Sequence, residues 1–111
     1  MVIVYLTLMP HVICLRDPWE TLPTTDGTLR QRRAFQKPTG LGPGDIVRLV
    51  IDGAAGLLAV AVNEQHQTAP PTGAVASFDI TALLQPRNFI EFALAGDGSR
   101  GEVRLEIDSA G

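Results

Sequence analysis

Few side chains in this chain of 111 residues have the types and spacing that acid–base, nucleophilic or metal chemistry requires. The 12 acidic residues fall in turns and on the polar sides of apolar runs, so the sequence contains no evident acid–base pair. The only two histidines, His11 and His66, lie far apart in the sequence and do not form a metal-binding signature. We therefore expect a protein that is not an enzyme, with no catalytic residue, no metal site and no cofactor.

Cys14 is the only cysteine, which excludes an internal disulfide and a zinc site built from several thiolates. We expect it to pack as a small buried hydrophobic residue. A single cysteine fits a reducing compartment, and the apolar start of the chain lacks the basic region and cleavage site of a signal peptide. No run reaches the roughly 18 apolar residues of a membrane span, because Pro10, Arg16 and Asp17 interrupt the only candidate. We therefore expect a cytoplasmic protein with no membrane contact.

The polar stretch from Asn63 to Thr72 is the best candidate for a ligand site. It begins Asn-Glu-Gln-His, so it supplies donors and acceptors that suit the hydroxyl groups of a sugar. In a β-sandwich many strand side chains pack in the core, and the loops at the rim supply the ligand-binding residues. We predict that Asn63, Gln65 and His66 bind a ligand there, with Glu64 beside them. For Asn63 the alternative is a structural role in a turn.

Trp19 and Arg33 complete the set of predicted ligand-binding residues. Trp19 is the only tryptophan, and its ring either stacks on a sugar or covers one end of the core, which is the alternative we favour. Arg32 and Arg33 point to opposite faces if they lie in a strand, so only one of them can line a given groove. A structural ion pair is the favoured role for either. With Arg30 they form the only positive cluster in a chain of net charge −3, so we expect no nucleic-acid partner.

The elements that must position these residues are strands. Short apolar runs with period-2 alternation recur between Gly- and Pro-containing turns, and no window favours a helix longer than about two turns. The runs predict eight strands: 2–8, 11–16, 29–36, 46–51, 57–62, 75–80, 89–94 and 101–107. In the fourth run, Val47, Leu49 and Ile51 should face inward. We expect one all-β domain, residues 1–111, folded as a sandwich or jelly roll of about eight mainly antiparallel strands.

The segments between the strands give further expectations. The spaced glycines of 38–45 precede a β-rich run rather than a helix, so they do not form a phosphate-binding loop. Residues 52–56 should form a tight hairpin connection. Thr81 should cap a short helical turn that follows a buried Phe78 and ends at a buried Leu84. Phe89 and Phe92 are also expected in the core.

Several phrases, taken in order, resemble the sugar-binding jelly-roll domain of glycoside hydrolase family 2. They are Trp19-Glu20, Asp26-Gly27, Arg32-Arg33-Ala-Phe35-Gln-Lys-Pro38, Gly44-Asp-Ile-Val-Arg-Leu-Val-Ile-Asp-Gly53, Leu58-Ala-Val-Ala-Val-Asn63, and Phe78-Asp-Ile-Thr-Ala-Leu-Leu84 with Pro86-Arg-Asn88. The resemblance covers roughly Trp19 to Ile107 and implies a galactose-binding-like β-sandwich. It also implies that catalytic carboxylates belong to a separate barrel domain. Glu64 stands where that family has a glycine after its asparagine, so we expect an altered turn.

Two functions follow from these expectations. The first is a non-catalytic carbohydrate-binding module that uses the loop rim. The second is a protein-interaction or structural β-sandwich with no functional sugar site, whose partner is another protein or a second copy of the chain. A sugar module should show a polar cleft with an exposed aromatic ring, whereas an interaction module should show an apolar patch or an open strand edge.

Overall fold

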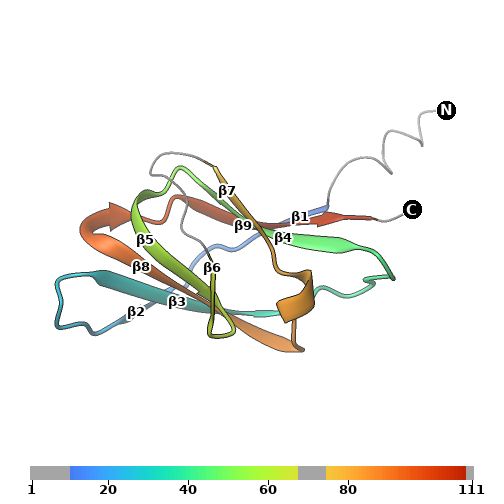
Figure 1. The fold of residues 1–111 in the computed structure, drawn as a ribbon, viewed down its shortest axis with the longest axis horizontal. Helices are drawn as coiled ribbons and strands as arrows, with labels where there is room; N and C mark the ends of the chain where they lie inside the picture. The colour runs from blue at the N-terminus through green and yellow to red at the C-terminus, as the bar shows by residue number, and fades with distance from the viewer. Residues whose placement is uncertain (1–10, 68–74, 110–111) are drawn as a thin grey trace.

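The computed structural model describes residues 11–67 and 75–109, and these form two antiparallel sheets packed face to face (Figure 1). Within these ranges there are nine strands, and no helix beyond one 3₁₀ turn, η1 (Thr81–Leu83). The strands are β1 (His11–Cys14), β2 (Glu20–Leu22), β3 (Leu29–Gln36), β4 (Ile46–Asp52), β5 (Ala55–Val62), β6 (Gln65–Gln67), β7 (Ala76–Asp79), β8 (Arg87–Ser99) and β9 (Glu102–Asp108). The expected all-β sandwich is therefore confirmed, and the expected strand 2–8 lies outside the described residues.

Each sheet is organised around a strand from the C-terminal part of the chain. The four-stranded sheet has the order β1-β9-β4-β7, and the five-stranded sheet has the order β2-β3-β8-β5-β6. Every neighbouring pair is antiparallel. Thus β9 joins β1 to β4, and β8 joins β3 to β5. Neither sheet contains its full set of pairings without these two late strands.

The core lies between the sheets and follows from the alternation of side chains along the strands. On β4, Val47, Leu49 and Ile51 are fully buried, as expected. On β8 the same alternation buries Ile90 and Phe92, while Glu91 between them faces outward. These side chains make one continuous cluster, and burying a Leu, Ile or Phe side chain contributes about 1.5–3 kcal/mol each.

The connection 52–56 is not a hairpin, contrary to the expectation. The strands on either side of it, β4 and β5, belong to different sheets, so the chain crosses from one layer of the sandwich to the other. Gly53 and Gly56 have φ of 79° and 70°, which glycine adopts without a steric penalty. The glycines correctly indicated a sharp turn. They could not indicate that β4 pairs with β9 and β5 with β8, rather than β4 with β5.

Two expected loops contain short strands. β2 lies in the predicted loop 17–28, where it pairs with β3, and β6 lies in the predicted loop after Asn63, where it pairs with β5. β8 also continues to Ser99, through residues that were expected to form a turn. Strands of three residues carry too little alternation to be seen in the sequence, and their pairing partners determine them.

Four expectations for single side chains were wrong. Cys14 is exposed, because it lies on the outward side of the edge strand β1. Phe78 and Leu84 are only partly buried and pack against the border of the core. Thr81 does not cap η1, for no side chain provides a cap. Its hydroxyl instead accepts a hydrogen bond from the Val47 backbone N–H at 2.9 Å and donates to Asp79 Oδ1 at 2.7 Å, which fastens the start of η1 to β4.

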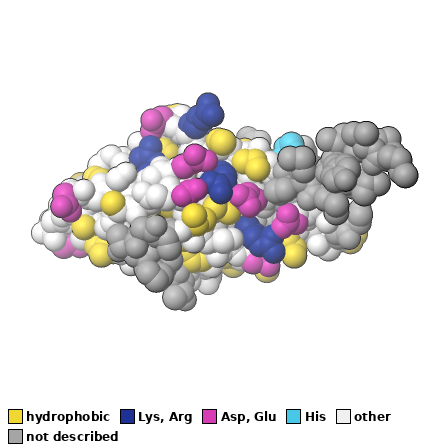
Figure 2. Space-filling model, turned by 90° about the horizontal axis from the view of Figure 1, so that it is seen from above, with side chains coloured by type: hydrophobic (Ala, Val, Ile, Leu, Met, Phe, Trp, Pro, Cys, Tyr) yellow, Lys and Arg dark blue, Asp and Glu magenta, His cyan; other side chains and the backbone are white. Residues whose placement is uncertain are grey.

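The outward side of the four-stranded sheet carries charges of both signs. Arg104 on β9 lies 2.8 Å from Glu106, 3.2 Å from Glu102 and 3.5 Å from Asp52. Its hydrogen bond with Glu106 is the main cause that raises the pKa of Arg104 above its ordinary value. Figure 2 shows a face of the molecule on which basic and acidic side chains alternate among hydrophobic ones. Such a mixed surface produces no long-range field of one sign.

Among residues 11–67 and 75–109, the structure contains no helix with the length and hydrophobicity of a membrane span.

Candidate functional site

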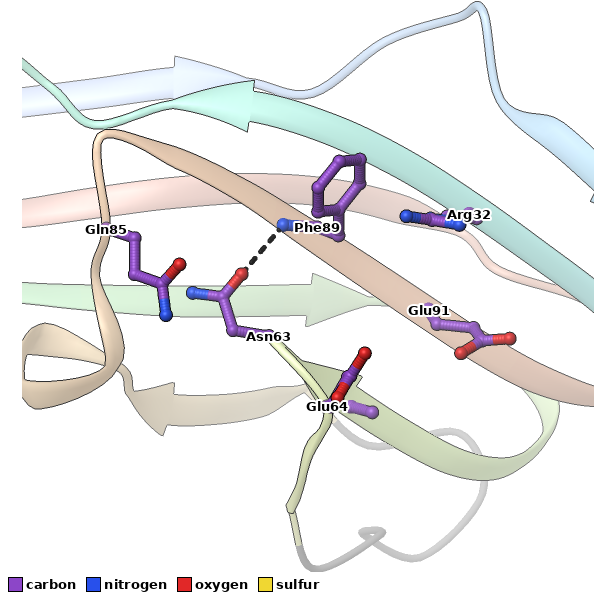
Figure 3. A pocket seen from close by; sticks show the side chains of 7 residues that line it. Arg32, Asn63, Glu64, Gln85, Phe89 and Glu91 are labelled. Carbon is purple, nitrogen blue, oxygen red and sulfur yellow. Dashed lines mark hydrogen bonds between the residues drawn. The ribbon is translucent and has the colours of Figure 1, made fainter.

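A hollow on the outward side of the five-stranded sheet is the best-formed candidate site among the described residues. Its volume is about 380 Å³. It is lined by Arg32 of β3, Ala61 of β5, Asn63 and Glu64 of the β5–β6 turn, Gln85 of the loop before β8, and Phe89 and Glu91 of β8 (Figure 3). Residues from three strands, a turn and a loop thus converge on one place.

The register of the strands determines where Arg32 and Glu91 lie in this hollow and why the hollow has depth. Arg32 lies opposite Glu91, and Glu91 lies opposite Ala61, so the three side chains form a row across the sheet. Their faces are fixed because Ile90 and Phe92, on either side of Glu91, are buried between the sheets. Ala61 presents only a methyl group, which leaves space between Glu91 and the β5–β6 turn.

Phe89 forms the aromatic part of the hollow and is half-buried. The Arg32 guanidinium lies 4.1 Å from the centroid of its ring, and that of Arg87 lies 5.5 Å from it. Both distances are within the range of a cation–π interaction. The expectation of Phe89 as a core residue was therefore wrong, because Asn88 and Ile90 take the inward positions instead.

The two acidic side chains of the hollow differ in their surroundings. The Glu91 carboxylate lies 3.3 Å from the Arg30 guanidinium, which partly neutralises it. Glu64 is exposed and has φ of 68°, next to Asn63 with φ of 50°. Positive φ at both central residues defines the two-residue turn that suits a hairpin. The turn thus keeps the geometry of an asparagine–glycine turn even though glutamate occupies the second position.

Asn63 is tied into the fold by its side chain. Its Nδ2 donates to the Leu83 carbonyl at 2.8 Å and to Asn88 Oδ1 at 2.9 Å, and its Oδ1 accepts from the Phe89 backbone N–H at 2.9 Å (Figure 3). The fully buried Asn88 Oδ1 also accepts from the Gln85 backbone N–H at 2.7 Å. Asn63 therefore forms one wall of the hollow, while its amide group is occupied by structural hydrogen bonds.

The structure brings only part of the predicted ligand set together. His66 is exposed on β6, and it lies opposite Ala61, beside the hollow. Gln65 is exposed at the same sheet edge but lies opposite the inward-facing Val62. The remainder of the predicted loop, from Thr68 to Thr72, lies outside the described residues.

Trp19 and Arg33 lie on the other side of the five-stranded sheet. The Trp19 ring stacks on the buried Phe92, with centroids 5.2 Å apart and planes inclined by 22°. Its Nε1 donates to the Leu15 carbonyl at 3.3 Å. Arg33 donates to the carbonyl oxygens of Arg16 at 2.7 Å and Ala34 at 2.9 Å. Trp19 therefore covers the core, as the favoured interpretation predicted. The prediction that Arg32 and Arg33 point to opposite faces of the sheet is also confirmed.

Sequence reasoning missed four of the seven residues that line the hollow, namely Ala61, Gln85, Phe89 and Glu91, and it favoured an ion pair for Arg32. Among residues 11–67 and 75–109, no carboxylate lies within 4.0 Å of Arg32 or Arg33. The alternation of Phe89 and Glu91 with Ile90 and Phe92 was a usable signal for the outward face. The convergence of β3, β5 and the β5–β6 turn was not visible without the sheet order.

Comparison with solved structures identifies the architecture. One similar structure is a β-D-glucuronidase from Dictyoglomus thermophilum, with a TM-score of 0.77, 13% sequence identity, and coverage of 92% of this chain and 28% of that one. The chain has the fold of a domain of such enzymes. An FMN-binding β-glucuronidase from Faecalibacterium prausnitzii L2-6 has a TM-score of 0.70 and 20% identity, over 89% of this chain and 23% of that one.

The chain therefore spans about a quarter of the length of these glucuronidases. No protein-family model and no curated protein sequence matches it. The similarity confirms the expected β-sandwich fold, which the chain shares with one part of these glucuronidases. Within the described residues, no group of three or more histidine, cysteine, aspartate or glutamate side chains is arranged to hold a metal ion.

Proposed function

We propose that this chain is a non-catalytic carbohydrate-binding module and that it binds sugar in the hollow of the five-stranded sheet. One observation carries the proposal: the hollow combines a guanidinium donor, an amide, two carboxylate acceptors and an aromatic ring on a single outward face. These groups belong to Arg32, Gln85, Glu64, Glu91 and Phe89. The site differs from the predicted rim of Asn63, Gln65 and His66 because the Asn63 amide is already hydrogen-bonded within the fold.

The chemistry of the lining suits a polyhydroxylated ligand. Each sugar hydroxyl donates one hydrogen bond and accepts others, and the hollow supplies both acceptors and donors. Hydrogen bonds to charged groups contribute about 1.5–3 kcal/mol each, roughly twice a neutral one. A volume of about 380 Å³ lies at the small end of ligand sites, which suits one or two sugar rings. With Phe89 partly covered by Arg32, stacking contributes little, so affinity should be in the millimolar range.

Two features support a role without catalysis. The chain corresponds to about a quarter of the glucuronidases with which it shares a fold, so it has room for one domain of such an enzyme. In the hollow, Glu91 is paired with Arg30, and Glu64 is exposed on a turn. A glycosidase acid lies in an apolar, buried setting, whereas Glu91 pairs with an arginine and Glu64 faces solvent. We infer a module that holds carbohydrate near a catalytic domain.

Titration of the isotope-labelled chain with mono- and oligosaccharides, followed by backbone amide shifts, tests the proposal. Saturable shifts at Ala61, Glu64 and Glu91 are expected. An Ala61→Leu variant fills the hollow and should abolish them, whereas Ser77→Leu, on the outward side of β7, should leave them unchanged. If the shifts appear at the Trp19 end of the sandwich, or at no site, the assignment of the hollow to carbohydrate is wrong.

A protein-interaction or structural module is the second candidate. The observation that favours it is that two aromatic rings available to a sugar are already engaged, Trp19 with Phe92 and Phe89 with Arg32. The exposed large hydrophobic residues, Val12, Leu58 and Val75, lie on separate elements. A sedimentation experiment at increasing concentration tests self-association. A stable dimer that is lost with Leu58→Glu, in a chain that shows no response to sugars, would favour this function.

A further inference from the structure

Glu91 is paired with an arginine that is not the one directly opposite it in the sheet. In the β3–β8 register Glu91 lies opposite Arg32, yet its carboxylate is 3.3 Å from the guanidinium of Arg30, which is diagonal to it. Arg32 is displaced in the same direction, because its guanidinium lies 4.1 Å from the ring centroid of Phe89, the next outward residue of β8. The outward side chains of the two strands therefore interact in a staggered arrangement.

A direct arrangement of the same side chains is equally accessible to the sheet. In it the Arg32 guanidinium pairs with Glu91, and Arg30 extends into solvent, to which its side chain is already 47% exposed. Directly opposite residues of an antiparallel pair have Cβ atoms about 4.5–5.5 Å apart, so an arginine reaches a glutamate without strain. The exchange requires rotation of side chains alone, and every backbone hydrogen bond between β3 and β8 is retained.

The two arrangements differ in free energy by little. Each contains one ion pair, and the staggered one adds a cation–π contact, which is weak at a partly exposed position. Glu20 also lies opposite Arg32, on β2, but it is exposed and more than 4.0 Å from the guanidinium. A fully hydrated carboxylate thus does not draw Arg32 from the ring. Glu91 is only 33% exposed and attracts a cation more strongly, but Arg30 already occupies it.

The arrangement that is adopted decides whether the hollow contains an open aromatic face. Arg32, Phe89 and Glu91 all line the hollow (Figure 3). In the staggered arrangement the guanidinium covers the ring, whereas in the direct one it lies beside Glu91 and the ring faces the hollow. Arg87 also lies near the ring, 5.5 Å from its centroid, but it does not line the hollow. Arg32 is therefore the cover on the side of the hollow.

From this geometry, and resting on the proposed function, we infer that Arg32 is a movable cover of the sugar site and that Arg30 controls it through Glu91. A sugar places the apolar C–H face of its ring on Phe89, and Arg32 moves to Glu91. Arg30 is then released to solvent. Because the ligand must supply the free energy that uncovers the ring, it binds more weakly than it would bind a hollow already in the direct arrangement.

Titration of the isotope-labelled chain with methyl β-D-glucoside, followed by backbone and side-chain shifts, tests this inference. In the free protein the ring current of Phe89 should shift the side-chain protons of Arg32 upfield, and at saturation these shifts should return toward ordinary values. Arg30→Gln should cause the same return without sugar. It should also bind the glucoside about two- to fivefold more tightly, the factor that corresponds to one cation–π contact. Arg16→Gln makes the same charge change on the loop after β1 and should alter neither quantity.

A double variant shows whether the gain depends on the ring. In Phe89→Leu the aromatic face is absent, so the addition of Arg30→Gln should give no increase in affinity. A gain that persists in the Phe89→Leu background would mean that the sugar does not use the uncovered ring, and the inference would be wrong. Circular dichroism checks that each variant retains the sandwich. The Arg32 shifts of the wild-type chain test the movement without any substitution.

The outcomes separate this inference from the proposed function. Saturable shifts in the hollow with unchanged Arg32 shifts, and equal affinities for the wild-type protein and Arg30→Gln, would overturn the movable cover and leave carbohydrate binding intact. An absence of any response to the glucoside, both in the wild-type protein and in Arg30→Gln, would overturn the proposed function and the cover together.

Discussion

The side-chain amide of Asn63 donates to the side-chain oxygen of Asn88 across 2.9 Å, and this bond joins the β5–β6 turn to the start of β8. Asn88 is fully buried, and its Nδ2 donates to the Gln85 carbonyl at 2.8 Å and, more weakly, to the Phe35 carbonyl at 3.4 Å. Within the described residues, no buried side-chain polar atom lacks a partner. The pair therefore holds three segments together beside the hollow.

Replacing Asn63 should destabilise the fold strongly. Asn63→Gly keeps a residue that accepts φ of 50° but removes partners from Asn88, the Phe89 N–H and the Leu83 carbonyl. Leaving buried groups unpaired costs about 1–3 kcal/mol each, so we expect a loss of about 3 kcal/mol in the free energy of unfolding. Urea denaturation measures it. Gln65→Gly, on the exposed edge strand, is the control, with a loss near 1 kcal/mol. Equal losses in the two variants would contradict the role given to Asn63.

Glu64→Gly should stabilise the protein. Glutamate at φ of 68° carries a steric penalty of about 1–2 kcal/mol that glycine does not, partly offset by the greater freedom of glycine in the unfolded chain. A net gain of about 0.5–1 kcal/mol is expected in thermal or urea unfolding. Glu64→Ala is the matched control, because it removes the same carboxylate without relieving the backbone. If both variants gain stability equally, the carboxylate and not the backbone is responsible.

Phe92 and Phe89, three positions apart on β8, should respond very differently to truncation. Phe92 is fully buried and stacks on Trp19, so Phe92→Ala should cost about 3–5 kcal/mol. Phe89 lies on the outward face, and Phe89→Ala should cost about 1 kcal/mol, mainly through the lost contact with Arg32. Fluorescence of the single tryptophan follows unfolding in both. A larger loss for Phe89→Ala would mean that the two faces of β8 are reversed.

Two aspartates each accept hydrogen bonds from the threonine two residues later, and both should make the free energy of unfolding depend on pH. Asp26 Oδ1 accepts from the hydroxyl and backbone N–H of Thr28, as Asp79 Oδ1 does from Thr81. In each case the threonine hydroxyl is the main cause that lowers the pKa of the carboxyl below 3.8, against a smaller opposing effect of burial. A lowered folded pKa stabilises the protein above the unfolded value and loses that stabilisation as the pH falls through the folded value.

We therefore expect the unfolding free energy to decrease as the pH falls below about 4, with a shallower decrease in the double variant Asp26→Asn, Asp79→Asn. The amide oxygen still accepts both hydrogen bonds but carries no charge, so the double variant should be less stable than the wild-type protein at neutral pH and should approach it as the pH falls. The pair Glu20→Gln, Asp97→Asn, two exposed residues outside the ion pairs of the described residues, is the charge-matched control. Parallel pH profiles for the wild-type protein and the double variant would refute the contribution of these two carboxylates.

The sequence predicted the strands that have both a polar and an apolar side but not the order in which they pair. Alternation located β3, β4 and β9 closely and assigned Val47, Leu49 and Ile51 to the core. It could not separate a hairpin at 52–56 from a crossing between sheets, because both need a glycine turn. The pairing is set by contacts with β8 and β9, which are distant in the sequence.

The candidate site was predicted less well than the fold, for a related reason. The turn-forming role of Asn63 was predicted correctly, but its partners Leu83 and Asn88 come from a different part of the chain. Arg32 and Phe89 meet only through the β3–β8 register. A hollow formed across three strands has no signature in any one of them, whereas a loop rich in polar residues attracts attention by composition alone.

The central positions of β8 and β9 have a consequence for synthesis of the protein in the cell. While the ribosome is still adding residues 87–108, β3 and β5 have no strand between them, and neither do β1 and β4. Contacts between segments so far apart in sequence form slowly, because closing a long loop loses chain entropy before strand pairing contributes any stabilisation. The two sheets can therefore complete their pairings only after β9 has emerged from the ribosomal exit tunnel.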